Sequence, residues 1–187
     1  MLYLCKCLLT FGMTDKQEKI LEAALELFAS EGYASTPTSR IAKKAGVSEG
    51  LIFRHFENKH GLLNALIKEA EERLGQLFGP ILFENDPKKV IAKTISMPFM
   101  VIDQREQDFW KLQFILKWQP EYNNPNKMKP LLDKLSRAFA DLGYQEPENE
   151  ASLLSYIIDN ISTEILKGNI EPGDQHMKTF LLKKYKV

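Results

Sequence analysis

A short stretch in the first third of the chain carries side chains suited to binding a phosphate backbone. Positions 40–59 hold two acidic residues and five basic ones, which are Arg40, Lys43, Lys44, Arg54 and Lys59. Positions 15–31 have the opposite bias, with five acidic residues and two basic ones, although the whole chain is balanced at 25 of each. The positive charge is therefore local. It indicates a nucleic-acid contact, with a merely solvated helix face as the alternative.

Small and aliphatic residues in the same stretch predict two crossed helices joined by a tight turn. Gly46 can adopt the left-handed conformation that ends a first helix, and Ala42 is small enough to let a second helix cross closely. Ile52 would pack the second helix back onto the first. Thr36 and Ser48 are residue types that can cap the two helices. The pattern is that of a helix-turn-helix, whose second helix can enter the major groove of B-DNA.

A supporting helix is predicted before this motif. Thr14 and Gln17 have the spacing of a capping box, and apolar residues follow at the i, i+3, i+4, i+7 spacing of one helix face until Gly32. These apolar residues are Ile20, Leu21, Ala24, Leu25, Leu27 and Phe28. Any three-helix bundle would show such a stripe, so the crossing geometry of the next two helices is what favours a DNA-binding head.

The ordered motifs of this region closely resemble the amino-terminal domain of the TetR (tetracycline-repressor-like, TetR/AcrR) transcriptional regulators. The pattern A-x-x-x-F-x-x-x-G-[YF] is matched at 24–33, and I-A-x-x-A-G-V-S at 41–48. The pattern G-x-[IL]-[YF]-x-[HY]-F is matched at 50–56 and is followed by Asn-Lys at 58–59. Motifs in this order over more than thirty positions are a specific signal, unlike a lone short motif.

The resemblance implies that the end of the second helix, the turn and the third helix bind double-stranded DNA. It puts phosphate contacts at Thr36, Thr38, Ser48, Phe53, His55 and Lys59. It puts Glu49, Gly50, Leu51 and Arg54 on or beside the base-reading surface. Arg54 is the best candidate for a directional contact, because its guanidinium is a charged fork with several donors.

Two positions depart from the family pattern. Position 53 is commonly Tyr, whose hydroxyl donates to a phosphate, and Phe53 keeps the ring but loses that bond. Position 51 is commonly small and polar, whereas Leu51 offers only apolar contact, for example to a thymine methyl. These losses are the reason to consider a head that no longer reads sequence.

The remainder of the chain reads as one helix after another, with apolar runs broken by Gly, Pro or Asn. Helices are predicted over about 59–78 (ended by Gly79-Pro80), 87–102, 105–119, 127–142, 148–167 and 174–185. The fold class is therefore all-α, with about nine helices in total. We expect an extension at 1–13, a helix-turn-helix DNA-binding domain at 14–60, and a helical effector-binding and dimerisation domain at 61–187. The fourth helix would connect the two domains.

Large, adaptable side chains are frequent in the middle helices, where the resemblance implies a pocket for a small molecule. The residues predicted to line it are Met97, Met100, Phe109, Trp110, Gln113, Phe114, Trp118 and Phe139. The alternative is ordinary core, because Met and aromatic residues at helical spacing usually pack in the interior. An effector that suits this lining would be apolar or aromatic.

The predicted helix at 148–167 has an apolar face broader than one small domain needs to cover. The predicted dimer interface consists of Leu154, Ile157, Ile158, Ile161 and Ile165, with Leu181 from the last helix. The resemblance implies a four-helix dimer interface of this kind. Two-fold symmetry in turn predicts a palindromic operator.

Together these features predict a ligand-responsive transcriptional regulator in the cytoplasm, by default a repressor that releases its operator when the effector binds. The alternative is a helical interaction module of the same fold that has lost sequence-specific DNA binding. An enzyme is disfavoured, because the three histidines lack ligand spacing and no glycine-rich phosphate loop, G-x-S-x-G or H-E-x-x-H motif occurs. No metal or cofactor is expected, and no membrane partner.

The two cysteines, Cys5 and Cys7, lie in an apolar segment before Met13. A disulfide across one intervening residue would be strained, so the pair fits a reducing interior. The segment is too short to span a bilayer and lacks a signal-peptide cleavage site. Either translation starts at Met13, which we prefer, or residues 1–12 form an arm that packs on the head or on DNA.

Overall fold

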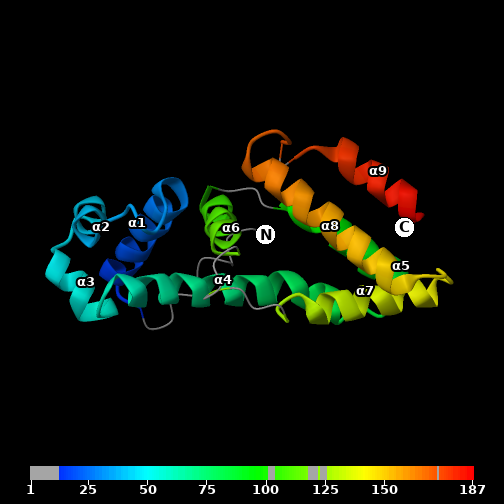
Figure 1. Ribbon diagram of the computed structural model, residues 1–187, viewed down its shortest axis with the longest axis horizontal. Helices are drawn as coiled ribbons and strands as arrows, with labels where there is room; N and C mark the ends of the chain where they lie inside the picture. The colour runs from blue at the N-terminus through cyan, green and yellow to red at the C-terminus, as the bar shows by residue number, and fades with distance from the viewer. Residues whose placement is uncertain (1–12, 101–103, 118–121, 123–125, 172) are drawn as a thin grey trace. The chain divides into compact units, whose positions relative to one another are not determined.

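The computed structural model describes residues 13–100, 104–117, 122, 126–171 and 173–187, and this part of the chain is all-helical (Figure 1). Nine α-helices and one short 3-10 helix occur within it, which confirms the predicted fold class. Contacts group the chain into two compact units. The first runs up to Arg73 and includes Asp108–Leu116, and the second comprises Leu74–Gln107 and Lys117–Val187. The cysteine-containing segment at 1–12 lies outside the described residues.

The first unit begins with three helices, α1 (Asp15–Glu31), α2 (Thr38–Ala45) and α3 (Glu49–Phe56). The predicted capping box of α1 is present, since the Thr14 hydroxyl accepts from the Gln17 amide and the Gln17 side chain accepts from the Thr14 amide at 2.8 Å. The apolar stripe of α1 is buried, as are Ile41 and Ile52 of the next two helices. The three helices thus share one apolar core, which fixes the crossing of α2 and α3.

The fourth helix, α4 (Lys59–Leu82), contributes residues to both units. It was predicted to end at Gly79-Pro80, and that prediction is wrong, because Pro80 lies inside the helix. Pro80 has no N–H to donate, but the helix continues past it because the Phe83 amide still donates to the Gly79 carbonyl at 3.0 Å. The Lys93 ammonium also donates to the Pro80 carbonyl at 3.0 Å.

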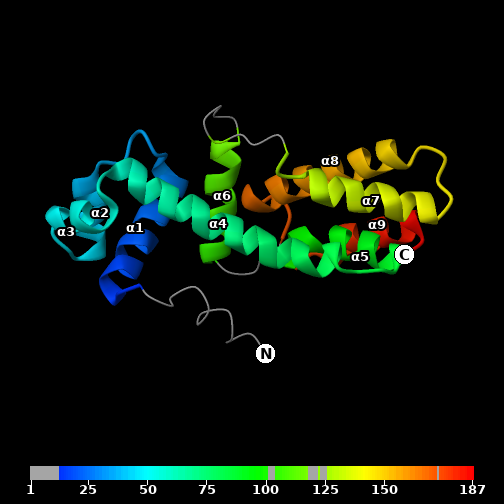
Figure 2. The same ribbon diagram turned by 90° about the horizontal axis from the view of Figure 1, so that it is seen from below.

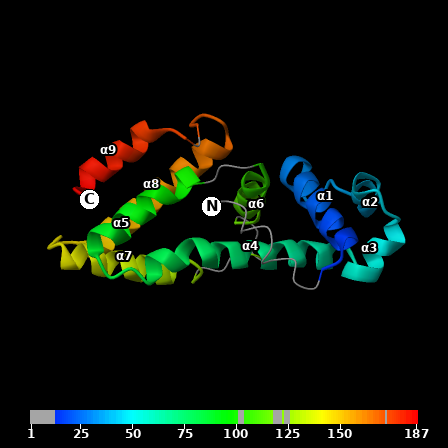
Figure 3. The same cartoon turned by 180° about the vertical axis from the view of Figure 1, so that it is seen from behind.

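The second unit is built from α5 (Pro87–Ser96), a 3-10 helix (Met97–Met100), α7 (Lys129–Asp141), α8 (Pro147–Leu166) and α9 (Gln175–Tyr185). Helix α7 lies along α8, and α5 contacts α7, α8 and α9 (Figures 2 and 3). Fully buried Ile91, Leu135, Phe139 and Leu154 form the centre of its core. Helix α6 (Gln104–Leu116) begins in this unit, and its larger part belongs to the first.

No helix in the described part of the chain is long and apolar enough to cross a membrane.

Candidate nucleic-acid interface

The turn between α2 and α3 depends on Gly46, as predicted. Its backbone is left-handed, with φ 67° and ψ 35°, a conformation that glycine adopts without steric cost. The Val47 amide then donates to the Ala42 carbonyl at 3.0 Å, which satisfies one of the free carbonyls at the end of α2. Ala42 and Ile52 are buried at the crossing, with 4% and 0% of their surface exposed. The angle between α2 and α3 is therefore fixed by the left-handed backbone at Gly46 and by the buried side chains of Ala42 and Ile52.

The two predicted caps behave differently from expectation. Thr36 does not cap α2, because the residue before the helix is Pro37 and no side-chain cap bond forms. Instead Thr36 is fully buried, and its hydroxyl donates to the Gly32 carbonyl at 2.9 Å, at the end of α1. The prediction of a cap at Thr36 is wrong because the hydroxyl is hydrogen-bonded to the end of α1. That hydroxyl is consequently not available for the predicted phosphate contact. Ser48 does precede α3, but without a side-chain cap bond.

The outer face of α3 combines apolar and cationic surface. At 100° per residue, Gly50 and Arg54 lie on the side opposite buried Ile52, and Leu51 and Phe53 lie on the two flanks. Phe53 is 46% exposed, Leu51 is partly exposed, and Arg54 is exposed. Arg54 makes no hydrogen bond or ion pair with any other residue that the structure describes. Its guanidinium is free to meet a base or a phosphate.

A hydrogen bond joins the starts of α2 and α3. The Thr38 hydroxyl donates to Oε1 of Glu49 at 2.5 Å. This contact holds the Glu49 carboxylate against the start of α2. At the other end of α3, His55 is partly buried, and its ring lies edge-on to that of Phe56 with 6.3 Å between centroids.

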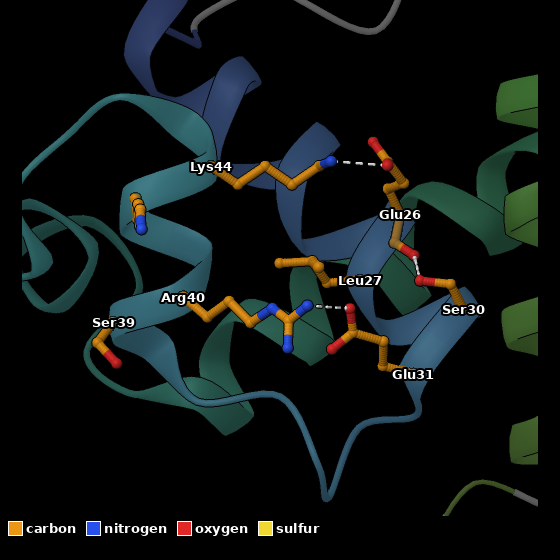
Figure 4. A pocket seen from close by; sticks show the side chains of 8 residues that line it. Glu26, Leu27, Ser30, Glu31, Ser39, Arg40 and Lys44 are labelled. Carbon is orange, nitrogen blue, oxygen red and sulfur yellow. Dashed lines mark hydrogen bonds and ion pairs between the residues drawn. The ribbon is translucent and has the colours of Figure 1, made fainter.

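Two of the five basic residues counted in this region are already paired with α1 (Figure 4). Arg40 Nη2 lies 2.7 Å from Glu31 Oε1, and Lys44 Nζ lies 2.6 Å from Glu26 Oε1. Both pairs border a hollow of about 800 Å³, which is also lined by Leu27, Ser30, Ser39 and Lys43. The positive charge free to meet phosphates is thus smaller than the sequence count indicates.

Lys59 is held in place at the start of α4. Its Nζ lies 4.5 Å from the centroid of the Tyr33 ring and donates to the Ala34 carbonyl at 3.3 Å. Partial burial lowers the pKa of this ammonium from its ordinary value. A cation fixed in this way loses little side-chain entropy when it meets a phosphate.

The sequence did not reveal how the connection between α3 and α4 is built. Glu57 has a positive φ of 66° and follows α3 directly. The Asn58 side chain then accepts from the Gly61 amide at 2.9 Å, which caps α4. A Cβ on Gly61 would lie 2.0 Å from the Phe56 carbonyl oxygen. The signal that could have been used is an Asn three residues before a Gly at the start of an apolar helix.

The residues predicted to line an effector pocket fall in different parts of the described chain. Met97 and Phe139 belong to the core of the second unit, and Met100 is 63% exposed. The α6 residues Phe109, Trp110, Gln113 and Phe114 are grouped with the first unit, where the Arg73 guanidinium lies 4.3 Å from the Phe109 ring centroid. Trp118 lies outside the described residues. The pocket stays a prediction.

Most residues predicted to form the dimer interface lie in the core of the chain itself. Five of the six, Leu154, Ile158, Ile161, Ile165 and Leu181, are buried there, and Ile157 packs against them. Leucine and isoleucine spacing marks an apolar helix face but does not say whether α7 or a second chain covers it. The exposed apolar side chains of α8 and α9 are Leu153, Tyr156 and Phe180, at 48%, 72% and 57% exposure.

No group of three or more His, Cys, Asp or Glu side chains that could hold a metal ion occurs among the residues described.

Comparison with known proteins agrees with this geometry. The family model for "Bacterial regulatory proteins, tetR family" matches residues 20–66. The uncharacterized HTH-type transcriptional regulator YvkB of Bacillus subtilis is 31% identical over 147 residues, which cover 74% of this chain and 75% of YvkB.

Two solved structures share the fold. A TetR-like transcriptional regulator from Rhodococcus sp. RHA1 has a TM-score of 0.76 at 16% identity, covering 91% of this chain and 96% of its own. AibR, solved in complex with isovaleryl coenzyme A and operator DNA, has a TM-score of 0.64 at 16% identity, with the same coverage of 91% and 96%. The match to YvkB extends over most of both chains, and the helix-turn-helix matches the family model. The chain therefore belongs to the tetR family of bacterial regulatory proteins, transcriptional regulators with a helix-turn-helix DNA-binding domain.

Proposed function

We propose that this protein is a repressor that binds a palindromic operator as a homodimer and releases it when a small apolar or aromatic effector binds. The observation that carries the proposal is the outer face of α3. There Arg54 is exposed without a partner among the described residues, while Ile52 fixes the helix from behind. A rigid helix with a free guanidinium suits insertion into the major groove.

The proposed DNA contacts are of two kinds: those that position the protein on the duplex and those that read the base sequence. Lys59, held against Tyr33, and Ser48, at the start of α3, are suited to phosphates. Phosphate contacts set affinity and orientation but carry no sequence information, so sequence must be read by α3. Few free cations per head predict modest binding by one subunit, and a second half-site raises the affinity of the dimer.

The exposed apolar side chains of α8 and α9 support a dimer. Leu153 and Tyr156 are three residues apart on α8 and therefore share a side of that helix. With Phe180 of α9 they leave apolar surface on the second unit that a second copy would cover. We therefore keep α8 and α9 as the helices of the dimer interface. The residues that meet the second copy are these exposed ones rather than the buried ones predicted from the sequence.

AibR, solved in complex with isovaleryl coenzyme A and operator DNA, supports binding of a small molecule as well as DNA by a protein of this fold, and release of the operator by the effector is part of the proposal. An effector acts only through different affinities for the DNA-bound and free forms of the protein. The expected result is therefore weaker binding of the effector when operator is present. A ligand that binds equally with and without operator would refute the coupling for that ligand.

The test of DNA recognition is selection of duplexes from a random library by the full chain, followed by fluorescence anisotropy over a salt series. We expect an enriched inverted repeat. The Arg54→Ala variant should bind it about 5- to 150-fold more weakly, the loss expected for one directional base contact. Lys88→Ala is the matched control, because it removes one positive charge from an exposed position on α5.

Failure of enrichment, with weak binding that salt abolishes equally for all duplexes, would overturn the proposal. That result would favour the interaction module of the same fold.

A further inference from the structure

We propose that α3 selects operator half-sites in which a thymine lies on the base pair next to a guanine, with Leu51 against the thymine methyl and Arg54 on the guanine. This inference rests on the proposed function, because it needs α3 to enter the major groove. It adds which two bases the DNA-binding head recognises.

The positions of the two side chains on α3 support adjacent contacts. Leu51 and Arg54 are three residues apart, so they are neighbours on the helix surface. Gly50 lies beside them with no atom within 4 Å of the position where its Cβ would be. The helix backbone can therefore approach the base edges closely beside these two side chains.

The chemistry of each side chain selects a base. Leu51 has neither donor nor acceptor, and the C5 methyl of thymine is the apolar group that projects furthest into the major groove. Arg54 has donors only, and guanine presents two acceptors, O6 and N7, in a geometry that matches the guanidinium fork. A polar residue at position 51 would not favour thymine through its methyl group.

Acceptors that would favour other bases are scarce on this face. Adenine and cytosine present amino groups in the major groove, and recognising them requires an acceptor from the protein. The carboxylate on the first turn of α3 is that of Glu49, and Thr38 holds it at the junction with α2 at 2.5 Å. The free face is left with apolar and donor groups, which favours thymine and guanine.

The experiment uses the full chain and the duplex enriched in the selection described above. Each thymine is replaced singly by deoxyuridine, which removes only the methyl group, and each guanine by 7-deazaguanine, which removes only N7. We expect about fourfold weaker binding for deoxyuridine at one position in each half-site, the value for one methyl-sized group withdrawn from water. 7-Deazaguanine at the adjacent base pair should weaken binding about fivefold or more.

Two variants assign these effects to side chains. Leu51→Ala should bind thymine and deoxyuridine duplexes equally, and Arg54→Ala should no longer distinguish guanine from 7-deazaguanine. Phe53→Ala is the matched control, since it removes the other exposed apolar side chain of α3. It should weaken binding to every duplex alike and keep the fourfold effect of deoxyuridine. Circular dichroism of each variant checks that the head remains folded.

The outcomes separate the two proposals. A specific duplex whose binding does not depend on any thymine methyl, or depends on it equally in Leu51→Ala, overturns this inference and leaves the repressor proposal standing. Failure to enrich any duplex overturns both.

Discussion

Gly46 and Gly61 are both required by the fold, but for different physical reasons. Gly46 is needed for its left-handed backbone, with φ 67°, at the turn between α2 and α3. Gly61 has no such backbone requirement, and its constraint is space, because a Cβ there would lie 2.0 Å from the Phe56 carbonyl oxygen. A backbone oxygen cannot move aside as the end of a side chain can. The absence of a side chain at position 61 therefore lets α4 start close to the end of α3.

The first prediction compares two glycines of α4. Gly61→Ala should lower the free energy of unfolding by about 1–3 kcal/mol, the usual cost of inserting a methyl group where there is no room. Gly75→Ala should raise it by up to about 1 kcal/mol, because no atom lies within 4 Å of its Cβ position. Urea unfolding followed by circular dichroism measures both. Equal stability of the two variants would contradict the close approach of Gly61 to Phe56.

A second prediction concerns Tyr185 in the core of the second unit. Its hydroxyl is buried and has no hydrogen-bond partner among the described residues. Burial raises the pKa of Tyr185, and the nearby Glu150 carboxylate and Tyr144 raise it further. An unsatisfied buried hydroxyl costs about 1–3 kcal/mol, so Tyr185→Phe should leave stability unchanged or raise it by about 1 kcal/mol. Tyr144→Phe, at a partly exposed position, is the control and should have little effect. Marked destabilisation by Tyr185→Phe would show that the hydroxyl has a partner.

At the scale of helices and turns, the link between α4 and α5 is organised by one carboxylate. Glu84 accepts from Lys93 Nζ at 2.7 Å and from the Asn85 and Asp86 amides at 3.0 and 3.1 Å. The hydrogen bond from Lys93, followed by that from the Asp86 amide, lowers the pKa of Glu84 to about 2. Lys93 also binds the Pro80 carbonyl, so the same contacts fasten α5 to the last turn of α4.

The third prediction is a pH dependence of stability at this link. Because the pKa of Glu84 is lower in the folded chain than its ordinary value of 4.5, its ionised form stabilises the fold above pH 4.5. That contribution is lost as the pH falls through about 2. Glu84→Gln should therefore be less stable than the unmodified chain near neutral pH, and the difference should shrink as the pH falls from 4.5 toward 2. Thermal unfolding over this pH range measures it.

The control removes a carboxylate that has no such partners among the residues described. Glu71→Gln changes the same charge at an exposed position on α4. Its effect on stability should be small and nearly independent of pH. A pH dependence equal to that of Glu84→Gln would mean that net charge, rather than the contacts of Glu84, is responsible.

The helices that could be predicted from the sequence are those whose ends depend on nearby residues. Thr14 and Gln17 cap α1 through contacts three residues apart, and Gly46 ends α2 through its own backbone. Predictions were wrong where a side chain makes a hydrogen bond that lies outside the motif from which the helix end was predicted. Thr36 donates to the end of α1 instead of capping α2, and α4 continues past Pro80, whose carbonyl Lys93 binds. Neither hydrogen bond belongs to the capping and helix-ending motifs from which these ends were predicted.

The same reason separates the predictable part of the DNA-binding face from the rest. Spacing along α3 identified Arg54 as outward and Ile52 as inward, because both follow from helical geometry alone. The pairing of Arg40 and Lys44 with α1 depends on how two helices cross, so the sequence overestimated the free positive charge. Similarly, the apolar face of α8 could be recognised, but not that the chain's own helices cover it.

At the scale of the whole molecule, the apolar side chains left exposed on α8 and α9 predict association of two chains. Tyr156 is 72% exposed, and Leu153 and Phe180 are also exposed to 48% and 57%. The fourth prediction is that the unmodified protein is a dimer and that Tyr156→Glu is a monomer at micromolar concentration, because a buried unpaired carboxylate opposes association. Size-exclusion chromatography with light scattering measures the mass. A monomeric unmodified protein would refute the interface.

The control for this prediction also links assembly to DNA binding. Phe83→Glu introduces the same charge at a side chain that is 87% exposed on the turn after α4, and it should remain dimeric. Both variants keep α3 intact, so each head should still contact a half-site. Only the dimer gains from holding two heads on one duplex, an advantage of about 10²-fold or more. Tyr156→Glu should therefore lose most of its affinity for the inverted repeat, while keeping the affinity of a single half-site. Unchanged operator binding by a monomeric Tyr156→Glu would mean that one head is enough for binding. An inverted repeat would then no longer be expected from the symmetry of a dimer.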